Sequence, residues 1–282
     1  MSTEVDRAAD YRYPEHHERQ NPLRKRRESP LKRIGTAIAA AFAVVVKFAA
    51  KLKLLLVALP KLKLLTTSGT MLVSVAAYAL LWPWQVAVGF VLLLLVHELG
   101  HAIQLKREGV PTGWPVFIPL FGAFIGMKRM PDDAAAEARV GLAGPVLGSI
   151  GTLVPLAIFL ATGSDLFRAL AFLGFFINLI NLVPVLPLDG GRAMAALSPW
   201  MWIAGLAILI ALGIFFPSPI VILVIVVGGV ELYRRFKTRR TPQSQAYFKV
   251  RPRTRALVAA VYVGLAGALT WGVAATHLVR HL

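Results

Sequence analysis

The chain has 282 residues, of which 57% are hydrophobic, and its mean hydropathy is +0.65. A soluble domain of this length is nearer half apolar and lacks several long uncharged runs, so the composition indicates an integral membrane protein. The sequence contains no cysteine. That excludes disulfides, thiolate metal ligands and cysteine nucleophiles.

The formal net charge is +17, and the basic residues are concentrated beside apolar runs. Nine Lys and Arg residues precede Gly35, and nine more lie between Arg234 and Arg255. Basic clusters next to apolar segments favour cytoplasmic loops and contact with anionic lipid. No nucleic-acid-reading module is recognisable, so we expect a lipid bilayer and no nucleic acid among the partners.

The first 66 residues are predicted to form two segments outside the membrane core. Residues 1–34 mix basic with acidic side chains and are expected to be a disordered, basic cytoplasmic tail. Residues 35–66 intersperse lysines with apolar residues and lack about 20 uninterrupted apolar positions. They are expected to be an amphipathic segment lying at the membrane interface, with a membrane hairpin as the alternative.

The rest of the chain predicts an all-α, polytopic membrane protein with about seven transmembrane helices. The long apolar runs that define these helices are Ser68–Leu81, Gln85–Lys106, Gly141–Thr162, Leu166–Pro187, Trp200–Phe216, Ile220–Tyr233 and Ala256–Ala275. The basic loops place the N-terminus, and every second connection after it, in the cytoplasm. The second and fourth runs therefore cross the membrane in the same direction.

Residues 110–130 are apolar but contain several prolines and glycines, so they cannot form a continuous helix. Val116–Ile118 and Ala123–Met127 are predicted to be short extended pieces of a re-entrant loop. Irregular backbone at membrane depth is tolerated where protein or a water-filled cavity covers it. A free strand edge there could pair with an extended peptide. A plain cytoplasmic loop is the alternative.

The second run ends in His-Glu-Leu-Gly-His, residues 97–101. Ionisable groups are costly in hydrocarbon and indicate a functional site. On a helix His97 and His101 share a face, at the spacing that suits two ligands of one zinc ion. Glu98 lies beside that face and is the candidate general base.

A catalytic zinc site needs a third protein ligand. The remaining histidines lie in the N-terminal tail or near the C-terminus, so a carboxylate is expected. Asp189 is the candidate, because it ends a run parallel to that of His101, near the same interface. Asn181, two helical turns before Asp189, could position the substrate. Asn178 is its competitor, and a hydrogen bond to a neighbouring helix is an equally good explanation for either amide.

The runs His97–His101, Gly141–Pro145 and Asn181–Gly191 resemble those of the site-2 protease family of intramembrane zinc metalloproteases. The resemblance implies a catalytic membrane core in residues 67–198, with a three-helix centre. The apolar runs that follow predict C-terminal transmembrane helices in residues 199–282. It implies zinc ligands at the two histidines and Asp189, catalysis by Glu98 and support by Asn181. The chain departs from many members because no stretch is long enough for a PDZ domain or for paired CBS domains.

The expected function is therefore that of a zinc-dependent intramembrane endopeptidase, a metalloendopeptidase that cleaves transmembrane segments of membrane proteins near the cytoplasmic face. Such cleavage is regulated intramembrane proteolysis, and family resemblance suggests an anti-sigma factor or a membrane-tethered transcription factor as substrate. The expected location is a bacterial plasma membrane, with a cytoplasmic N-terminus. The alternative function is a catalytically silent membrane adaptor that has kept a metal site.

Overall fold

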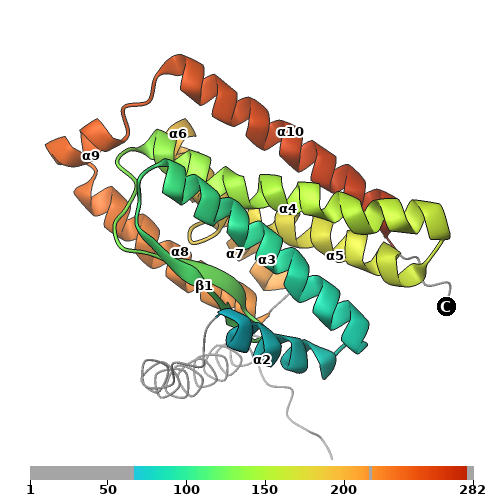
Figure 1. Cartoon of the computed structure of the whole chain (residues 1–282). Helices are drawn as coiled ribbons and strands as arrows, with labels where there is room; N and C mark the ends of the chain where they lie inside the picture. The colour runs from blue at the N-terminus through green and yellow to red at the C-terminus, as the bar shows by residue number, and fades with distance from the viewer. Residues whose placement is uncertain (1–66, 216–217, 278–282) are drawn as a thin grey trace, which may run out of the picture. The chain divides into compact units, whose positions relative to one another are not determined.

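The computed structural model describes residues 67–215 and 218–277, all of which fall within one compact unit. The expected tail and interfacial segment, residues 1–66, lie outside the described residues. The elements in chain order are α2 (Thr67–Ala79), α3 (Trp84–Arg107), β1 (Thr112–Ile118), β2 (Gly122–Met127), α4 (Ala134–Thr162), α5 (Asp165–Asn181), α6 (Asp189–Leu197), α7 (Pro199–Phe215), α8 (Pro219–Thr238), α9 (Pro242–Tyr247) and α10 (Pro252–Thr276) (Figure 1).

The fold is mostly helical, and three of the described helices are long and apolar enough to cross a membrane. These helices are α3, α4 and α10, with 24, 29 and 25 residues. An α-helix needs about 20 apolar residues to span the hydrocarbon, and α7 is a shorter apolar helix of 17 residues. A multi-pass membrane protein is therefore confirmed, while seven spans remain a prediction.

Helices α3, α4 and α5 lie side by side and form the centre of the described part (Figure 1). Helices α3 and α5 run parallel, because pairs with the same sequence offset meet along them. A Cβ at Gly89 would lie 2.5 Å from the Leu170 side chain, and eight residues later in each helix His97 contacts Asn178. The parallel direction agrees with the sequence expectation and brings the ends of both helices to the same level.

Helix α4 starts seven residues before the predicted Gly141. Asp133 is its N-cap and accepts a hydrogen bond from the Ala136 N–H at 2.7 Å. That bond satisfies one of the free amide groups of the first turn, so the helix can begin in the polar loop. Helix α4 ends at Gly163, whose φ of 68° is the left-handed conformation that favours glycine at a C-cap.

Helix α5 ends at Asn181, whereas the sequence predicted a helix up to Pro187. Proline cannot donate a backbone hydrogen bond and clashes with the preceding helical turn, so Pro184 and Pro187 stop the helix early. Residues 182–188 form a turn instead, and α6 begins at Asp189. This break turns the chain back toward α3 and carries Asp189 with it.

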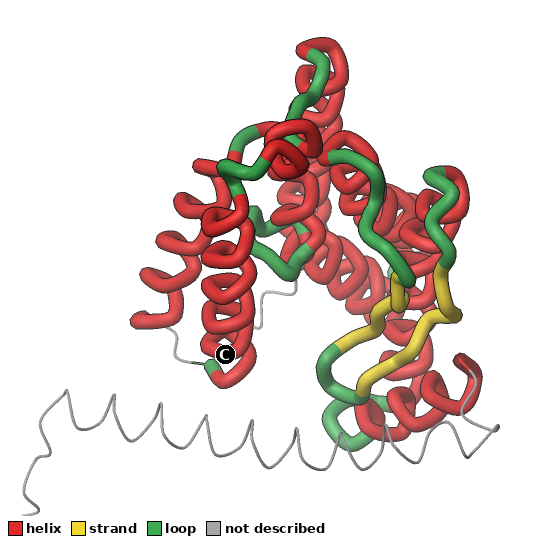
Figure 2. Tube along the Cα trace, turned by 90° about the vertical axis from the view of Figure 1, so that its left-hand side faces the viewer, coloured by secondary structure: helices red, strands yellow, loops and turns green. Residues whose placement is uncertain are grey.

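The two strands form one antiparallel hairpin in residues 110–130, where the sequence predicted short extended pieces. Helix α2 covers the outer edge of β1, since the Thr67 hydroxyl donates to the Pro115 carbonyl at 2.8 Å and the Phe117 N–H donates to the Thr70 hydroxyl. The other edge of the sheet belongs to β2. Figure 2 shows the hairpin as two yellow strands beside the helices.

Candidate metal centre

Three potential metal ligands from two helices meet in the core. His97 and His101 come from the last three turns of α3, and Asp189 is the first residue of α6. The Nε2 atoms of the two histidines are 3.2 Å apart, and they lie 3.1 and 3.2 Å from Asp189 Oδ2. The three residues are only 3%, 6% and 8% exposed. The structure thus brings together the three ligands that the sequence predicted.

The other nitrogen of each imidazole is held by an acceptor. His97 Nδ1 lies 2.8 Å from the Oδ1 atom of Asn178, whose own amide donates to the Gly174 carbonyl at 2.7 Å. His101 Nδ1 lies 2.8 Å from the Val140 carbonyl. Each Nδ1 must therefore carry the proton, and in the neutral ring Nε2 presents a lone pair. Metal-binding histidines commonly have this second contact, which fixes the tautomer and the ring orientation.

This arrangement fits a zinc ion. When both imidazoles are neutral, their Nε2 lone pairs and a carboxylate oxygen of Asp189 converge on one point, which is the set of donors that a divalent cation takes. In a tetrahedral zinc site with bonds of 2.0–2.1 Å, neighbouring ligand atoms are about 3.3–3.4 Å apart. The distances of 3.1 to 3.2 Å in the cluster are close to that value. Nitrogen and oxygen donors are also the ligands that zinc takes in catalytic sites.

Glu98 is buried beside the cluster, with 6% of its surface exposed. Among the described residues, the group of side chains that could share one metal ion contains His97, His101 and Asp189 and does not include Glu98. A buried carboxylate is unfavourable unless it has a partner or a function. Its position next to a ligand leaves Glu98 available to exchange a proton with a molecule at the metal.

Glycines of α4 allow this helix to form one wall of the site. A Cβ at Gly144 would lie 2.2 Å from His101 Nε2, and one at Gly148 would lie 2.3 Å from Asn178 Oδ1. Real Cβ atoms do not approach other atoms so closely, so any larger residue would displace the imidazole or the amide. The sequence drew attention to Gly141–Pro145 but gave no sign of which side chain each glycine faces.

The two candidate asparagines differ in what they contact. Asn178 is 1% exposed and holds His97, as described above. The Asn181 amide donates to the Ile177 carbonyl of its own helix at 3.0 Å and is half-buried. We call His97, His101 and Asp189 the metal cluster. The side chain that supports this cluster is thus Asn178, the alternative to Asn181 in the sequence analysis. A substrate-positioning role for Asn181 stays a prediction.

A second buried polar cluster joins the C-terminal helices to α4. Arg235 of α8 donates to both carboxylate oxygens of Glu137, at 3.0 and 2.5 Å, and the Tyr247 hydroxyl of α9 donates to Glu137 at 2.7 Å. Arg235 also pairs with Glu231, four residues before it in α8. We call Glu137, Arg235, Tyr247 and Glu231 the arginine cluster.

The arginine cluster is linked to the helix that carries Asp189. The guanidinium of Arg235 lies over the ring of Trp202, 4.8 Å from its centroid. The indole N–H of Trp202 donates to the Gly191 carbonyl at 2.6 Å, two residues after Asp189. Helices α7 and α8 therefore hold α6 in place. The sequence did not predict this cluster.

Comparison with known proteins supports the same reading of the site. Residues 85–164 match the model of peptidase family M50. The zinc metalloprotease MJ0392 of Methanocaldococcus jannaschii is 33% identical over 119 residues, which cover 39% of this chain and 34% of that protein. The putative zinc metalloprotease sll0528 of Synechocystis is 28% identical over 127 residues, or 41% of this chain and 32% of that protein.

A third relative is the putative zinc metalloprotease Rip3 of Mycobacterium tuberculosis, which is 32% identical over 141 residues. That match covers 46% of this chain and 35% of Rip3, so the chain spans about a third of the length of these curated relatives. The matched region of the family contains both histidines of the metal cluster. In residues 85–164 the chain is therefore similar to peptidase family M50, the family of the site-2 proteases.

Proposed function

We propose that this protein is a zinc-dependent intramembrane endopeptidase, which cleaves transmembrane segments of other membrane proteins near the cytoplasmic face. One observation carries the proposal: the Nε2 atoms of His97 and His101 and the Oδ2 atom of Asp189 lie 3.1 to 3.2 Å apart at the end of a membrane-spanning helix, beside the buried Glu98. The names of the relatives, all zinc metalloproteases, support it.

Each residue of the site would have a separate role in the proposed reaction. His97, His101 and Asp189 would hold the zinc ion, with Asn178 and the Val140 carbonyl fixing the imidazoles. When bound, zinc supplies a Lewis acid that polarises a carbonyl and makes water acidic enough to attack near neutral pH. Glu98 would take the proton from the attacking water and then deliver it to the leaving amide nitrogen.

The depth and direction of the site follow from the charges around it. Lys106 and Arg107 end α3 within two turns of His101, and positive residues favour the cytoplasmic side. The basic first turn of α10 lies against α6, the helix that begins at Asp189, because Arg255 donates to the Ala196 carbonyl. We place the site near the cytoplasmic face of a bacterial plasma membrane, in a chain with about seven spans and a cytoplasmic N-terminus.

The hairpin β1–β2 is the proposed re-entrant loop that receives the substrate. It is held beside the site, since Ile125 of β2 packs with Leu105 of α3 and with Val140, whose carbonyl holds His101. A helical substrate hides its amide groups in internal hydrogen bonds and must unwind before cleavage. The edge of β2 would pair with the unwound segment as an added strand.

The natural substrate would be a membrane protein that releases a cytoplasmic regulator. An anti-sigma factor or a membrane-tethered transcription factor would fit a site at this depth. The competing function is a silent adaptor with a retained metal site. An adaptor has no use for a buried carboxylate beside the metal, whereas Glu98 is present and buried.

The test compares wild type with Glu98→Gln in proteoliposomes that contain a model transmembrane substrate. We expect cleavage to fall by about 10²–10⁴-fold, which is the usual contribution of general acid–base catalysis. Zinc content should stay at the wild-type level. Glu108→Gln, at the polar end of the same helix, is the matched control and should cleave normally. Equal cleavage by Glu98→Gln and wild type would refute the proposal and favour the adaptor.

A further inference from the structure

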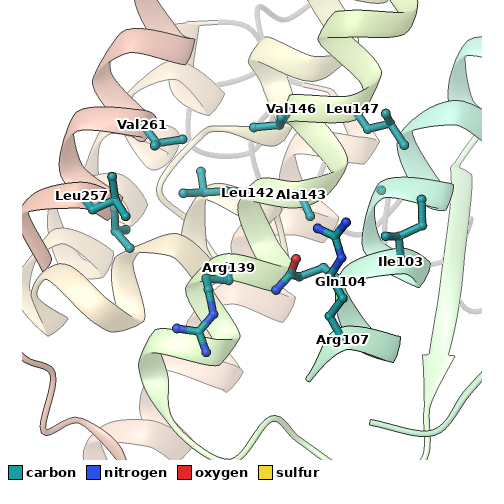
Figure 3. Close-up of a pocket in the computed structure, with 12 residues that line it drawn as sticks. Ile103, Gln104, Arg107, Arg139, Leu142, Ala143, Val146, Leu147, Leu257 and Val261 are labelled. Carbon is teal, nitrogen blue, oxygen red and sulfur yellow. The ribbon is translucent and has the colours of Figure 1, made fainter. Parts of the chain in front are cut away.

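A groove of about 370 Å³ lies between α3, α4 and α10, on the three helices that are able to cross a membrane. Figure 3 shows the residues that line it. Its floor includes Gly100 and Ala143, where α3 and α4 are so close that a Cβ at Gly100 would lie 2.3 Å from the Ala143 carbonyl oxygen. The groove is independent of the proposed protease chemistry, because none of the metal ligands lines it.

One end of the groove is cationic. Arg107, Arg139 and Gln104 lie there, at the bottom of the view in Figure 3. Glu108 binds Arg139 through both of its oxygens and accepts a hydrogen bond from Gln104. That pairing neutralises Arg139, but within residues 67–215 and 218–277 no carboxylate pairs with Arg107. The cationic end therefore keeps a net charge of about one.

Arg139 keeps donors free for a further ligand. A guanidinium has five N–H groups, and Glu108 takes one from Nε and one from Nη2. The remaining donors of Arg139 and the whole guanidinium of Arg107 are exposed beside the groove. Phosphate oxygens are the acceptors that such forked donors bind best.

The other end of the groove is apolar. Val146 and Leu147 of α4 and Val261 of α10 form its walls, at the top of Figure 3. All three helices have apolar, lipid-compatible outer surfaces, and Leu257 beside the groove is 65% exposed. An apolar cleft that opens into hydrocarbon and ends in arginines combines the two features that a phospholipid needs, a chain-binding wall and a headgroup site.

We propose that this groove binds one anionic phospholipid of the surrounding bilayer. The phosphate of the headgroup contacts Arg107 and the free donors of Arg139, and one acyl chain lies along Val146, Leu147 and Val261. A zwitterionic lipid has the same chains but adds a cation next to Arg107, so it binds less well. The charge at the groove thus selects the headgroup, and the apolar walls hold the chain.

The test uses the absence of cysteine in the sequence to place a single fluorescent label. Val261→Cys puts the label in the groove. Val263→Cys is the matched control, because it is about 3 Å further along α10 and about 200° around it, and Val263 is 68% exposed. Each labelled chain is reconstituted in phosphatidylcholine vesicles that contain a fixed fraction of brominated phosphatidylglycerol or brominated phosphatidylcholine, both of which quench fluorescence on contact.

We expect brominated phosphatidylglycerol to quench the Val261 label at least twofold more than brominated phosphatidylcholine, with equal quenching at Val263. Arg107→Gln should remove the preference, while Arg107→Lys and the control Arg253→Gln should keep it. Arg107 is exposed, so these variants should fold normally. The preference should persist in excess inorganic phosphate, because the acyl chain contributes to binding.

Three results would overturn the lipid site. The first is equal quenching by both lipids at Val261. The second is a preference that survives Arg107→Gln, which would show that Arg107 does not bind the headgroup, or one that disappears in free phosphate, which would show a site for free phosphate and not for a lipid. The third is a Val261 label that neither lipid quenches, because a groove closed to lipid holds a protein segment instead.

Discussion

The metal cluster and the arginine cluster are both buried polar groups that contact α4, but they satisfy their charges in different ways. In the arginine cluster, Glu137 is 2% exposed and accepts hydrogen bonds from Arg235 and Tyr247. The guanidinium of Arg235 therefore balances the charge of the Glu137 carboxylate. In the metal cluster, the Nε2 atoms of His97 and His101 and the Oδ2 atom of Asp189 lie within 3.2 Å of one another. Among the described residues, no Lys or Arg side chain forms an ion pair with Asp189.

This difference separates a structural site from a functional one. A buried ion pair complete in hydrogen bonds can hold helices together, and it offers nothing to a ligand. Burial and the neighbouring Glu137 carboxylate raise the pKa of the Tyr247 phenol, which therefore remains a hydrogen-bond donor. A cluster of neutral imidazoles and a carboxylate is favourable in the core only with an added cation, and this is the physical reason for the proposed metal site.

The largest expected effect is the loss of the metal on substitution of Asp189. Asp189→Ala removes one of three ligands and the only negative charge among them. We expect zinc affinity to fall by more than the roughly 10–100-fold that loss of an outer-shell partner produces. The zinc affinity of the protein in detergent is measured by competition with a coloured zinc chelator. Asp165→Ala, in the first turn of α5 and far from the cluster, is the control. Wild-type affinity in Asp189→Ala would show that the third ligand lies elsewhere.

Breaking the arginine cluster should change stability and leave the metal bound. Arg235→Gln leaves the buried Glu137 carboxylate without its cation, and breaking such a pair destabilises a protein by about 3–5 kcal/mol. Thermal unfolding in detergent should show a lower Tm, both with zinc and after chelation. The exposed neighbour Arg234→Gln should unfold like wild type. An Arg235→Gln protein that loses its zinc without a fall in Tm would reverse the roles of the two clusters.

The contact of Asn178 should have a smaller effect on the metal. Asn178→Ala frees the Nδ1 proton of His97 from its acceptor, so the imidazole is no longer fixed in one tautomer. We expect zinc affinity to fall about 10–100-fold. Asn181→Ala is the comparison, and it should bind zinc normally because its amide contacts only its own helix. Zinc affinities in the reverse order would assign the supporting role to Asn181.

The smallest effect concerns the pair Glu108–Arg139 at the polar end of α3. Hydrogen bonds from Arg139 lower the pKa of the Glu108 carboxyl. The pair therefore stabilises the fold at pH values above the ordinary glutamate pKa, and the contribution is lost as the pH falls through the lowered value. Such a partly exposed pair contributes no more than about 1 kcal/mol after solvent screening.

That pH dependence is measured as the difference in Tm between wild type and Glu108→Gln. We expect a small difference at pH 6 that disappears in acid, once the pH has fallen through the lowered pKa and Glu108 is as uncharged as glutamine. If the difference in Tm between wild type and Glu108→Gln grew as the pH fell, the Glu108–Arg139 pair would not stabilise the fold in the way described.

The sequence predicted the parts of the site that depend on chemistry and on the direction of the chain. His97 and His101 share a helical face by their spacing alone, and parallel helices bring Asp189 to their level. It could not predict that Asn178 rather than Asn181 faces His97, because the rotation of α5 is set by packing against α4. The arginine cluster could not be predicted from the sequence either, because it also depends on helix packing. Glu137 and Tyr247 are 110 residues apart and meet only when α8 and α9 pack on the core.

X-ray absorption at the zinc edge of the purified wild-type protein tests the central claim most directly, since it reports the ligands of the metal without any substitution. We predict one zinc ion per chain, with nitrogen and oxygen neighbours at about 2.0–2.1 Å. The outer scattering should correspond to two imidazole rings, those of His97 and His101. A protein without stoichiometric zinc, or a spectrum without imidazole scattering, would contradict the assignment of this cluster as the metal centre.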